Sequence, residues 1–165
     1  MSPFIRPATE NDITAILDIV NYNILNTNSI YDYDSRSLPE MQQWLADKQS
    51  AGWPVLVADI DGAVAGYATY GTFRTKEGYK FTVEHSVYVH HEHHGKGIGG
   101  KLLEQLIFAA KEQGIHMMVG CIDAGNKGSI AFHKRYGFTD GGLLREAAFK
   151  FGKWLDLQFM QLILR

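Results

Sequence analysis

The sequence predicts one α/β domain, residues 1–165, built on a mixed β-sheet. Two observations carry this prediction. β-rich runs and amphipathic stretches alternate in the order βααβββαβαβ, with room for one further strand near the C-terminus. A strand, a glycine-rich turn, a helix and a second strand also follow one another over residues 81–122, and such a crossover makes its two strands parallel. The length and a hydrophobic content of 45% suffice for one sizeable core.

Composition narrows the classes of function. A net charge of −2 gives no basic field, which argues against nucleic acid or an anionic membrane as the partner and favours a small-molecule substrate. The single cysteine excludes an internal disulfide, and no apolar run reaches the roughly 20 residues that span a bilayer. The first residues show no secretory signal, so a cytoplasmic protein is expected.

The first third of the chain predicts a short strand at residues 4–6 and two helices. Thr9 and Asp12 form a capping-box pattern before the first helix, and Ser37 and Glu40 repeat it before the second. Apolar residues then recur at helical spacing: Ile13, Ile16, Leu17, Val20 and Ile24 in the first helix, and Met41, Trp44 and Leu45 in the second.

The rest of the chain predicts mainly strands. Asp61-Gly62 is a strong hairpin signal between two antiparallel strands. The predicted elements are strands 54–59, 64–72 and 81–89, a helix closed by Gly114, an apolar strand 115–122, a helix 127–136 ended by Gly137, and one or two strands within 149–164.

The turn after the strand 81–89 has the chemistry of a phosphate site. Gly95, Gly97, Gly99 and Gly100 leave backbone N–H groups uncovered where a helix begins, and Lys96 adds a positive charge. The first N–H groups of a helix have no intrahelical partner, and together with the helix dipole they bind anions.

Two interpretations of this turn are open on spacing alone. The glycines at 95, 97 and 100 also fit a dinucleotide-binding turn, with Asp123 as the acidic residue that would bind a ribose. Five polar residues, however, separate the strand from Gly95, whereas a Rossmann turn follows its strand at once.

Two blocks of sequence resemble the GNAT acyltransferase superfamily. Residues 94–99, HGKGIG, resemble its Arg/Gln-x-x-Gly-x-Gly/Ala signature, with His94 where Arg or Gln is usual. Residues 126–138, NKGSIAFHKRYGF, resemble its second block. The flanking TVEHSVYV at 82–89 and KFGKWLDLQFMQ at 150–161 resemble the branch that acetylates phosphinothricin and methionine sulfoximine or sulfone.

The resemblance implies a mostly antiparallel sheet with two splayed central parallel strands, and acetyl-CoA as the co-substrate without a metal. The pantetheine arm would bond to the first of these strands like an added strand. The implied coenzyme-binding residues are Val87, Tyr88, Val89, Gly95, Lys96, Gly97, Ile98, Gly99, Gly100, Asn126 and Arg135.

Glu84 and His133 are the candidate catalytic residues. An α-amino group with a pKa of about 8 is only about a tenth neutral at pH 7, so transfer to it requires a proton acceptor. Glu84 is that candidate, because a carboxylate in a central strand is expensive to bury without a purpose. His133 stands where many members of the superfamily have a tyrosine that protonates the leaving thiolate; a structural histidine is the open alternative.

The acceptor is expected to be a small amino-acid-like amine. The resemblance places Arg74, Thr75 and Lys76 in the substrate loop, where a guanidinium would bind a carboxylate, and places Glu84, His85 and Ser86 around the amine. Phe151 stands where the phosphinothricin enzymes have a histidine, which favours the methionine sulfoximine type. Tyr31 and Tyr33, in the polar connection before the second helix, either line the pocket or anchor the loop.

Other classes of function stay open. The cluster of four histidines and Glu92 at 90–94 lacks the H-E-x-x-H metal pattern. A solvated turn is its main interpretation, and contacts to the coenzyme phosphates are the alternative. Cys121, inside an apolar strand, is read as a core residue rather than an acetyl carrier. The alternatives to the amino-acid acetyltransferase are an enzyme for protein N-termini or polyamines and a binding module without turnover. The resemblance also implies a homodimer.

Overall fold

The computed structural model describes residues 2–165 and contains a seven-stranded sheet with the strand order β1-β2-β3-β4-β5-β7-β6. Every neighbouring pair is antiparallel except β4 and β5, which are parallel. This arrangement confirms the predicted mixed sheet and its crossover. The strands are β1 Phe4–Pro7, β2 Val55–Ile60, β3 Ala63–Thr72, β4 Thr82–Val89, β5 Met117–Asp123, β6 Thr139–Lys150 and β7 Lys153–Ile163.

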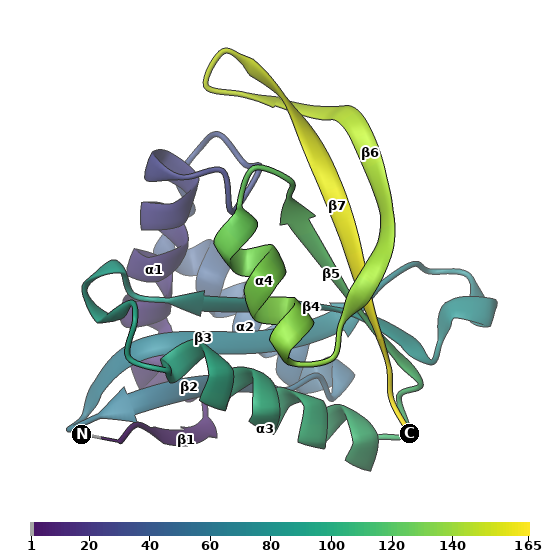
Figure 1. Ribbon diagram of the computed structural model, residues 1–165. Helices are drawn as coiled ribbons and strands as arrows, with labels where there is room; N and C mark the ends of the chain where they lie inside the picture. Colours follow the sequence, from purple (N-terminus) through teal and green to yellow (C-terminus); the bar gives the residue numbers. More distant parts are fainter. Residues whose placement is uncertain (1) are drawn as a thin grey trace.

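Four α-helices cover the two faces of this sheet (Figure 1). The helices α1 (Ile13–Asn26) and α2 (Leu38–Ala51) lie on one face, and α3 (Ile98–Glu112) and α4 (Lys127–Arg135) lie on the other. Each face has its own hydrophobic core: Ile16, Val20 and Met41 belong to the first, and Leu102, Leu106 and Met118 to the second. The α1/α2 face and the α3/α4 face are therefore separate packing layers.

Local signals set several element boundaries as the sequence predicts. The N–H of Glu40 donates to the Ser37 hydroxyl, and the N–H of Ser37 donates to the Glu40 carboxylate, which together cap α2. Asp61 and Gly62 both have positive φ, 52° and 86°, in the turn between β2 and β3. This is the conformation that a two-residue hairpin turn of type I′ requires.

The parallel strands β4 and β5 separate partway along their length. Their pairing begins at Thr82 with Met117 and ends at Glu84 with Val119. Beyond this point β4 stays paired with β3 as far as Val89, and β5 stays paired with β7 as far as Asp123. The sheet therefore opens between β4 and β5, which confirms the predicted splay.

The strand β6 is the element that sequence analysis did not assign. Of its residues Thr139–Lys150, only the last is buried, and its pairing with β7 is interrupted between Asp140 and Gly142 and between Leu144 and Ala148. An exposed edge strand with such irregularities has no alternation of buried and exposed residues for a pattern to detect. The prediction of strand only from residue 149 was wrong for this segment.

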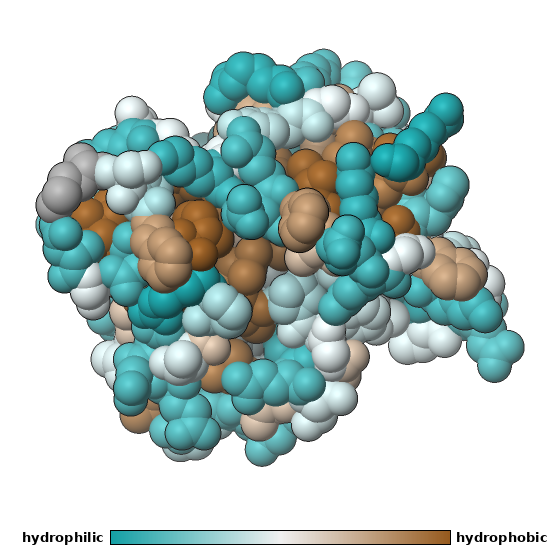
Figure 2. All heavy atoms as spheres, turned by 90° about the horizontal axis from the view of Figure 1, so that it is seen from below, coloured by the Kyte–Doolittle hydropathy of each residue, from teal (hydrophilic) through white to brown (hydrophobic). Residues whose placement is uncertain are grey.

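The outer surface is mixed in character. Seen from below, hydrophobic side chains appear as separate patches among hydrophilic ones (Figure 2). None of the helices in the described part of the chain has both the length and the apolarity needed to cross a bilayer.

Candidate active site

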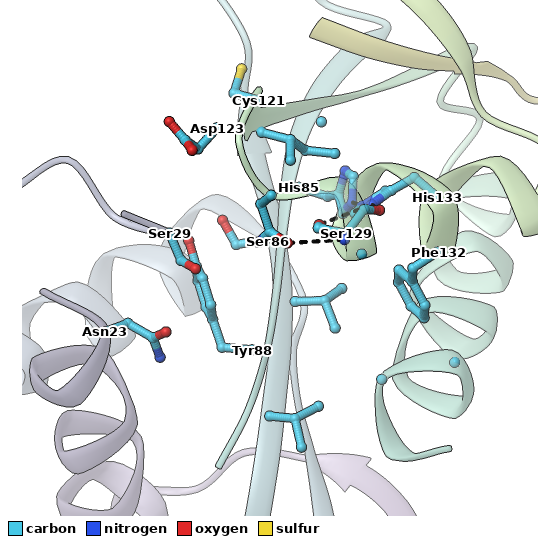
Figure 3. Close-up of a pocket in the computed structure, with 18 of the residues that line it drawn as sticks. Asn23, Ser29, His85, Ser86, Tyr88, Cys121, Asp123, Ser129, Phe132 and His133 are labelled. Atoms are coloured by element: carbon cyan, nitrogen blue, oxygen red, sulfur yellow. Dashed lines mark hydrogen bonds between the residues drawn. The ribbon is translucent and has the colours of Figure 1, made fainter. Parts of the chain in front are cut away.

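A cavity of about 810 Å³ occupies the opening between β4 and β5. It reaches from the C-terminal end of α1 on one face of the sheet to the start of α3 and to α4 on the other (Figure 3). Residues from the loop after α1, from both strands and from the glycine turn line it: Ser29, Tyr31, Glu84, Ser86, Tyr88, Gly95, Gly97, Gly99, Gly120, Cys121, Asp123, Asn126 and His133 are among them.

The glycine turn, residues 95–100, lies at one end of this cavity and has the geometry of an anion cradle. Gly95 and Gly97 have φ of 78° and 76°, a conformation that residues with a Cβ adopt at a cost. Helix α3 begins directly after Gly97, and the N–H of Lys101 is the one that bonds back to the Gly97 carbonyl, at 3.3 Å. The N–H groups of residues 98–100 come before this first intrahelical hydrogen bond, so they have no acceptor within the helix. Such N–H groups are suited to binding a diphosphate.

Two further residues of the coenzyme prediction lie at the two ends of α4. Asn126 and Arg135 line the same cavity. The Asn126 side chain also accepts a hydrogen bond from the Ser129 N–H at 3.1 Å and so caps α4. The Arg135 guanidinium lies 5.8 Å from the centre of the Phe132 ring. Lys96 is exposed, does not line the cavity, and has its Nζ 3.4 Å from His93 Nδ1.

The edge of β4 that faces β5 is open along Val87, Tyr88 and Val89, which line the cavity. The Val89 carbonyl accepts a hydrogen bond from His94 Nε2 at 3.0 Å, which closes the edge at that end. An extended amide-containing chain could pair with the remaining open edge as an additional strand would.

Glu84 projects from β4 at the point where the two strands separate. Its side chain is exposed, and its Oε1 accepts a hydrogen bond from the Cys121 thiol at 3.3 Å. The premise that a central-strand carboxylate would be buried was therefore wrong, because the opening of the sheet gives this position access to the cavity. Burial, reinforced by the Glu84 charge, raises the pKa of Cys121 to about 12, so the thiol stays protonated.

A second cavity of about 470 Å³ adjoins the first on the α1/α2 face. Glu84, Ser86 and Tyr88 line both cavities, so the two cavities adjoin along β4. Lys48 enters it from α2 and donates to the Tyr70 carbonyl at 2.9 Å. Burial lowers the pKa of Lys48 to about 8, although the Glu84 charge opposes the shift. The other lining residues include Arg36, Trp44, Trp53 and Thr69.

His133 and His85 lie on the opposite side of the opening, under α4 (Figure 3). Residues alternate along a strand, so His85 points to the α3/α4 face while its neighbours Glu84 and Ser86 point to the α1/α2 face. His85 therefore lies beside His133, with 2.9 Å between the two Nε2 atoms, and not beside Glu84. The sequence analysis missed this pair because only the fold joins residues 48 positions apart.

The predicted substrate loop lies outside both cavities. Arg74, Thr75 and Lys76 are exposed and contribute to neither lining. The positive charge of Arg74 opposes the rise in the pKa of Cys121, against the larger effect of burial.

Several lining residues had no signal in the sequence. Lys48, Trp44 and Trp53 belong to α2 and its C-terminal flank, and Asn23 and Ser29 to α1 and the loop after it. For Tyr31 the sequence left open whether it lines the pocket or anchors its loop. It does both, because it lines the cavity and its hydroxyl donates a hydrogen bond to Asp123 Oδ1 at 2.9 Å. Tyr33 is exposed, and its hydroxyl donates to the Phe149 carbonyl.

The histidine cluster at 90–94 divides between surface and cavity. His93 and His94 line the cavity beside the glycine turn. His91 stacks on Tyr22 of α1, with ring centres 4.0 Å apart, and on His90 at 4.4 Å. Within residues 2–165 no three His, Cys, Asp or Glu side chains are grouped as metal ligands.

Comparison with known proteins agrees with this geometry. A family model described as acetyltransferase (GNAT) domain matches residues 5–159. The L-methionine sulfoximine/L-methionine sulfone acetyltransferase of Pseudomonas aeruginosa is 46% identical over 98% of this chain and 95% of its own length.

Two solved structures are also similar to this chain. A GNAT superfamily phosphinothricin acetyltransferase from Sinorhizobium meliloti in complex with AcCoA has a TM-score of 0.96 and 37% identity, covering 99% of this chain and 89% of that one. A ribosomal-protein-alanine N-acetyltransferase from Brucella melitensis has a TM-score of 0.96 and 46% identity, covering 98% and 99%. As the two sequence blocks predict, this chain belongs to the GNAT acetyltransferase family and is an acetyl-CoA-dependent N-acetyltransferase.

Proposed function

We propose that this enzyme transfers the acetyl group of acetyl-CoA directly to the α-amino group of a small polar amino acid of the methionine sulfoximine, methionine sulfone or phosphinothricin type. The observation that carries the proposal is the opening between β4 and β5, which joins an anion cradle on one face of the sheet to a carboxylate on the other. The name of the P. aeruginosa relative supports the substrate class.

On the coenzyme side, the N–H groups of residues 98–100 would bind the diphosphate, and the open edge of β4 would bind the pantetheine amides. The hydroxyl of Tyr136, the residue that follows α4, packs directly on Gly100, so a Cβ at Gly100 would collide with it. Together these contacts would direct the thioester through the opening toward Glu84.

On the acceptor side, Glu84 would take a proton from the ammonium group of the amino acid. The Cys121 thiol donates to Oε1 and stays protonated, so it fixes the orientation of the carboxylate while Oε2 remains for the amine. Lys48 would add a positive charge for the substrate carboxylate, and Trp44 and Trp53 would bound the side chain. The role of Arg74, Thr75 and Lys76 in carboxylate binding stays a prediction.

At the leaving group, His133 would deliver a proton to the thiolate of coenzyme A. It lines the cavity from α4, across the opening from Glu84. The proton acceptor and the proton donor would then lie on opposite faces of the sheet, with the reacting carbon between them.

The test is release of free coenzyme A from acetyl-CoA with a panel of amines. We expect turnover with methionine sulfone, methionine sulfoximine and phosphinothricin, and little with putrescine. Turnover with peptides that begin with alanine, and not with free amino acids, would instead favour acetylation of protein N-termini, as the name of the B. melitensis protein suggests. Silence with every amine would contradict the proposal.

Two further predictions from the sequence accompany this function. The enzyme is proposed to act in the cytoplasm as a homodimer. Light scattering on the purified protein measures the second directly, and a mass of one chain, 18.5 kDa, would contradict it.

A further inference from the structure

Two buried histidines meet on the α3/α4 face of the opening (Figure 3). His85 comes from β4 and His133 from α4, and each keeps only 6% of its surface exposed. Their Nε2 atoms are 2.9 Å apart, which is hydrogen-bond distance, so one proton is required between them.

The outer nitrogens of both rings are also engaged. His85 Nδ1 lies 3.0 Å from the Val119 carbonyl, and His133 Nδ1 lies 2.7 Å from the Ser129 carbonyl. A carbonyl oxygen only accepts hydrogen bonds, so each Nδ1 must carry a proton. The neutral rings then have bare Nε2 atoms facing one another. The three contacts need three protons, whereas two neutral imidazoles have two.

We propose that His85 is the positioning partner of His133, and that the pair takes up a third proton between the two Nε2 atoms, which it delivers to the thiolate of coenzyme A. This inference rests on the proposed function. With the third proton, each of the three contacts, Nε2 to Nε2 and each Nδ1 to its carbonyl, contains one hydrogen. In any neutral arrangement of the two rings, one of these contacts brings two hydrogen-bond acceptors together without a hydrogen.

The surroundings of the pair make this proton easy to give up. Burial lowers the pKa of His85 to about 3, with repulsion from His133 adding to the shift, and burial likewise lowers the pKa of His133. The Phe138 ring lies 5.2 Å from the His85 ring and 5.1 Å from the His133 ring, centre to centre. The hydrogen bonds to the Val119 and Ser129 carbonyls act in the opposite direction and raise both pKa values, so the pair holds its third proton against burial and only weakly.

Charged and titratable groups on the neighbouring elements are directed elsewhere. Glu84 on β4 and Cys121 on β5 bond to each other on the other face. The Tyr70 hydroxyl on β3 donates to Gln113, and Arg135 on α4 lies on the Phe132 ring. Lys134 on α4 pairs with Asp140, while Tyr136 packs on Gly100. Among residues 2–165 neither His85 nor His133 forms an ion pair with a carboxylate, so no fixed negative charge holds the third proton.

The strand opposite leaves space for the pair. A Cβ at Gly120 of β5 would lie 2.9 Å from His85 Cε1 and 3.7 Å from His133 Nε2. Both rings and Gly120 line the cavity. The pair is therefore packed against a bare stretch of backbone at the opening, where the thiol end of the coenzyme would arrive.

The step balances as follows. The amine nitrogen forms a bond to the acetyl carbon, and the carbon–sulfur bond breaks with its electron pair left on sulfur. The proton between the two Nε2 atoms moves to that sulfur, and the neutral pair later takes up one of the two protons that the ammonium group has released through Glu84 and the solvent. The ammonium group loses two protons during transfer and the thiolate gains one, so one proton is released overall.

The first test is nitrogen-15 NMR of the wild-type protein labelled in its histidine rings, titrated from about pH 5 to about pH 9. We expect both Nδ1 atoms to stay protonated and the two Nε2 signals to change together as one shared proton is lost. Two Nε2 signals that stay unprotonated across this range would overturn the inference, whatever the activity.

The second test compares variants of His85 in the pH dependence of kcat. His85→Asn keeps a donor toward the Val119 carbonyl but places nothing near His133 Nε2. We expect kcat to fall about tenfold, with the KM for acetyl-CoA within about twofold, and the alkaline limb of the profile to move to lower pH. His85→Gln offers an amide oxygen to the His133 N–H, so it should move that limb part of the way back.

The exposed His116 provides the matched control, and His116→Gln should leave the profile unchanged. If both His85 variants lower kcat by the same factor at every pH, so that the shape of the pH profile does not change, His85 has a merely structural role. This result would contradict the inference. An enzyme that releases no coenzyme A with any amine would refute the proposed function, while the NMR titration would still decide whether the shared proton exists.

Discussion

The two faces of the sheet are built differently at the opening between β4 and β5. On the α3/α4 face, the anion cradle comes from consecutive residues, 95–100, at the start of α3. On the α1/α2 face, the groups around Glu84 come from α1, α2, β3 and β5 and from the loop after α1. In the proposed function, coenzyme binding thus depends on one short motif, whereas binding of the amino acid depends on tertiary structure. The two faces should therefore respond separately to mutation.

The largest expected effect belongs to Glu84→Gln. An amide cannot take a proton from the ammonium group, so kcat should fall about 100-fold or more, while the Kd for coenzyme A on the other face stays within about twofold. Coenzyme A release with methionine sulfone measures the first, and calorimetry measures the second. Glu92→Gln, an exposed carboxylate in the turn after β4, is the control. An unaltered rate across pH would remove Glu84 from the mechanism.

A buried lysine supports the α1/α2 face, where the amino acid is proposed to bind. Lys150 keeps 2% of its surface exposed, and its Nζ donates to the carbonyls of Ile24, Thr27 and Ile30 at 2.7, 2.8 and 2.5 Å. These carbonyls belong to the end of α1 and the loop that lines both cavities.

Lys150→Met should leave these carbonyls unpaired and lower the free energy of unfolding by about 2–3 kcal/mol, measured by urea titration. The KM for the amino acid should rise because the loop loosens, and the KM for acetyl-CoA should not. The exposed Lys153→Met serves as control. A parallel rise in both KM values would show that the two faces are not independent.

Coenzyme binding on the α3/α4 face can be weakened by straining the backbone alone. Gly97→Ala must place a Cβ at a φ of 76°, which costs about 1–2 kcal/mol in the left-handed region. Relaxation of the cradle should weaken coenzyme A binding about tenfold by calorimetry. Gly114→Ala carries the same strain, with φ of 73°, at the other end of α3. Equal losses of affinity in both variants would contradict a local role of the cradle.

The smallest effect concerns an ion pair away from the opening. Two nitrogens of the Arg6 guanidinium donate to the Asp12 carboxylate at 2.8 and 2.9 Å and hold the pKa of Asp12 below its ordinary value of 3.8. The stabilisation is therefore complete above the unfolded-state pKa and is lost as the pH falls through the folded-state pKa.

Asp12→Asn should lower the free energy of unfolding by about 1–2 kcal/mol at neutral pH and by less in acid. The catalytic activity should not change. Urea titrations at a series of pH values measure this, with the exposed Asp18→Asn as control. A constant difference between Asp12→Asn and the wild type down to acid pH would contradict the assignment.

The difference between the faces also explains what sequence analysis could predict. Ser37 with Glu40, Asp61-Gly62 and the glycine turn act within a few residues, so their patterns predicted real caps, turns and the cradle. Glu84 lies on a central strand as predicted, but its exposure was not predicted, because it depends on where β4 and β5 separate. Lys48 and the approach of His85 to His133 had no local signal, since each arises from packing between distant segments.

The state of the one thiol in the chain has a practical consequence for measuring the reaction. Thiolates attack alkylating and disulfide-exchange reagents, whereas Cys121 donates a hydrogen bond to Glu84 and keeps its proton, with a pKa of about 12. A colorimetric thiol reagent added during turnover should therefore count coenzyme A and leave the enzyme uncoloured. Loss of the carboxylate in Glu84→Gln would remove only the smaller cause of this raised pKa, so burial alone would then keep the dye from reacting with the protein.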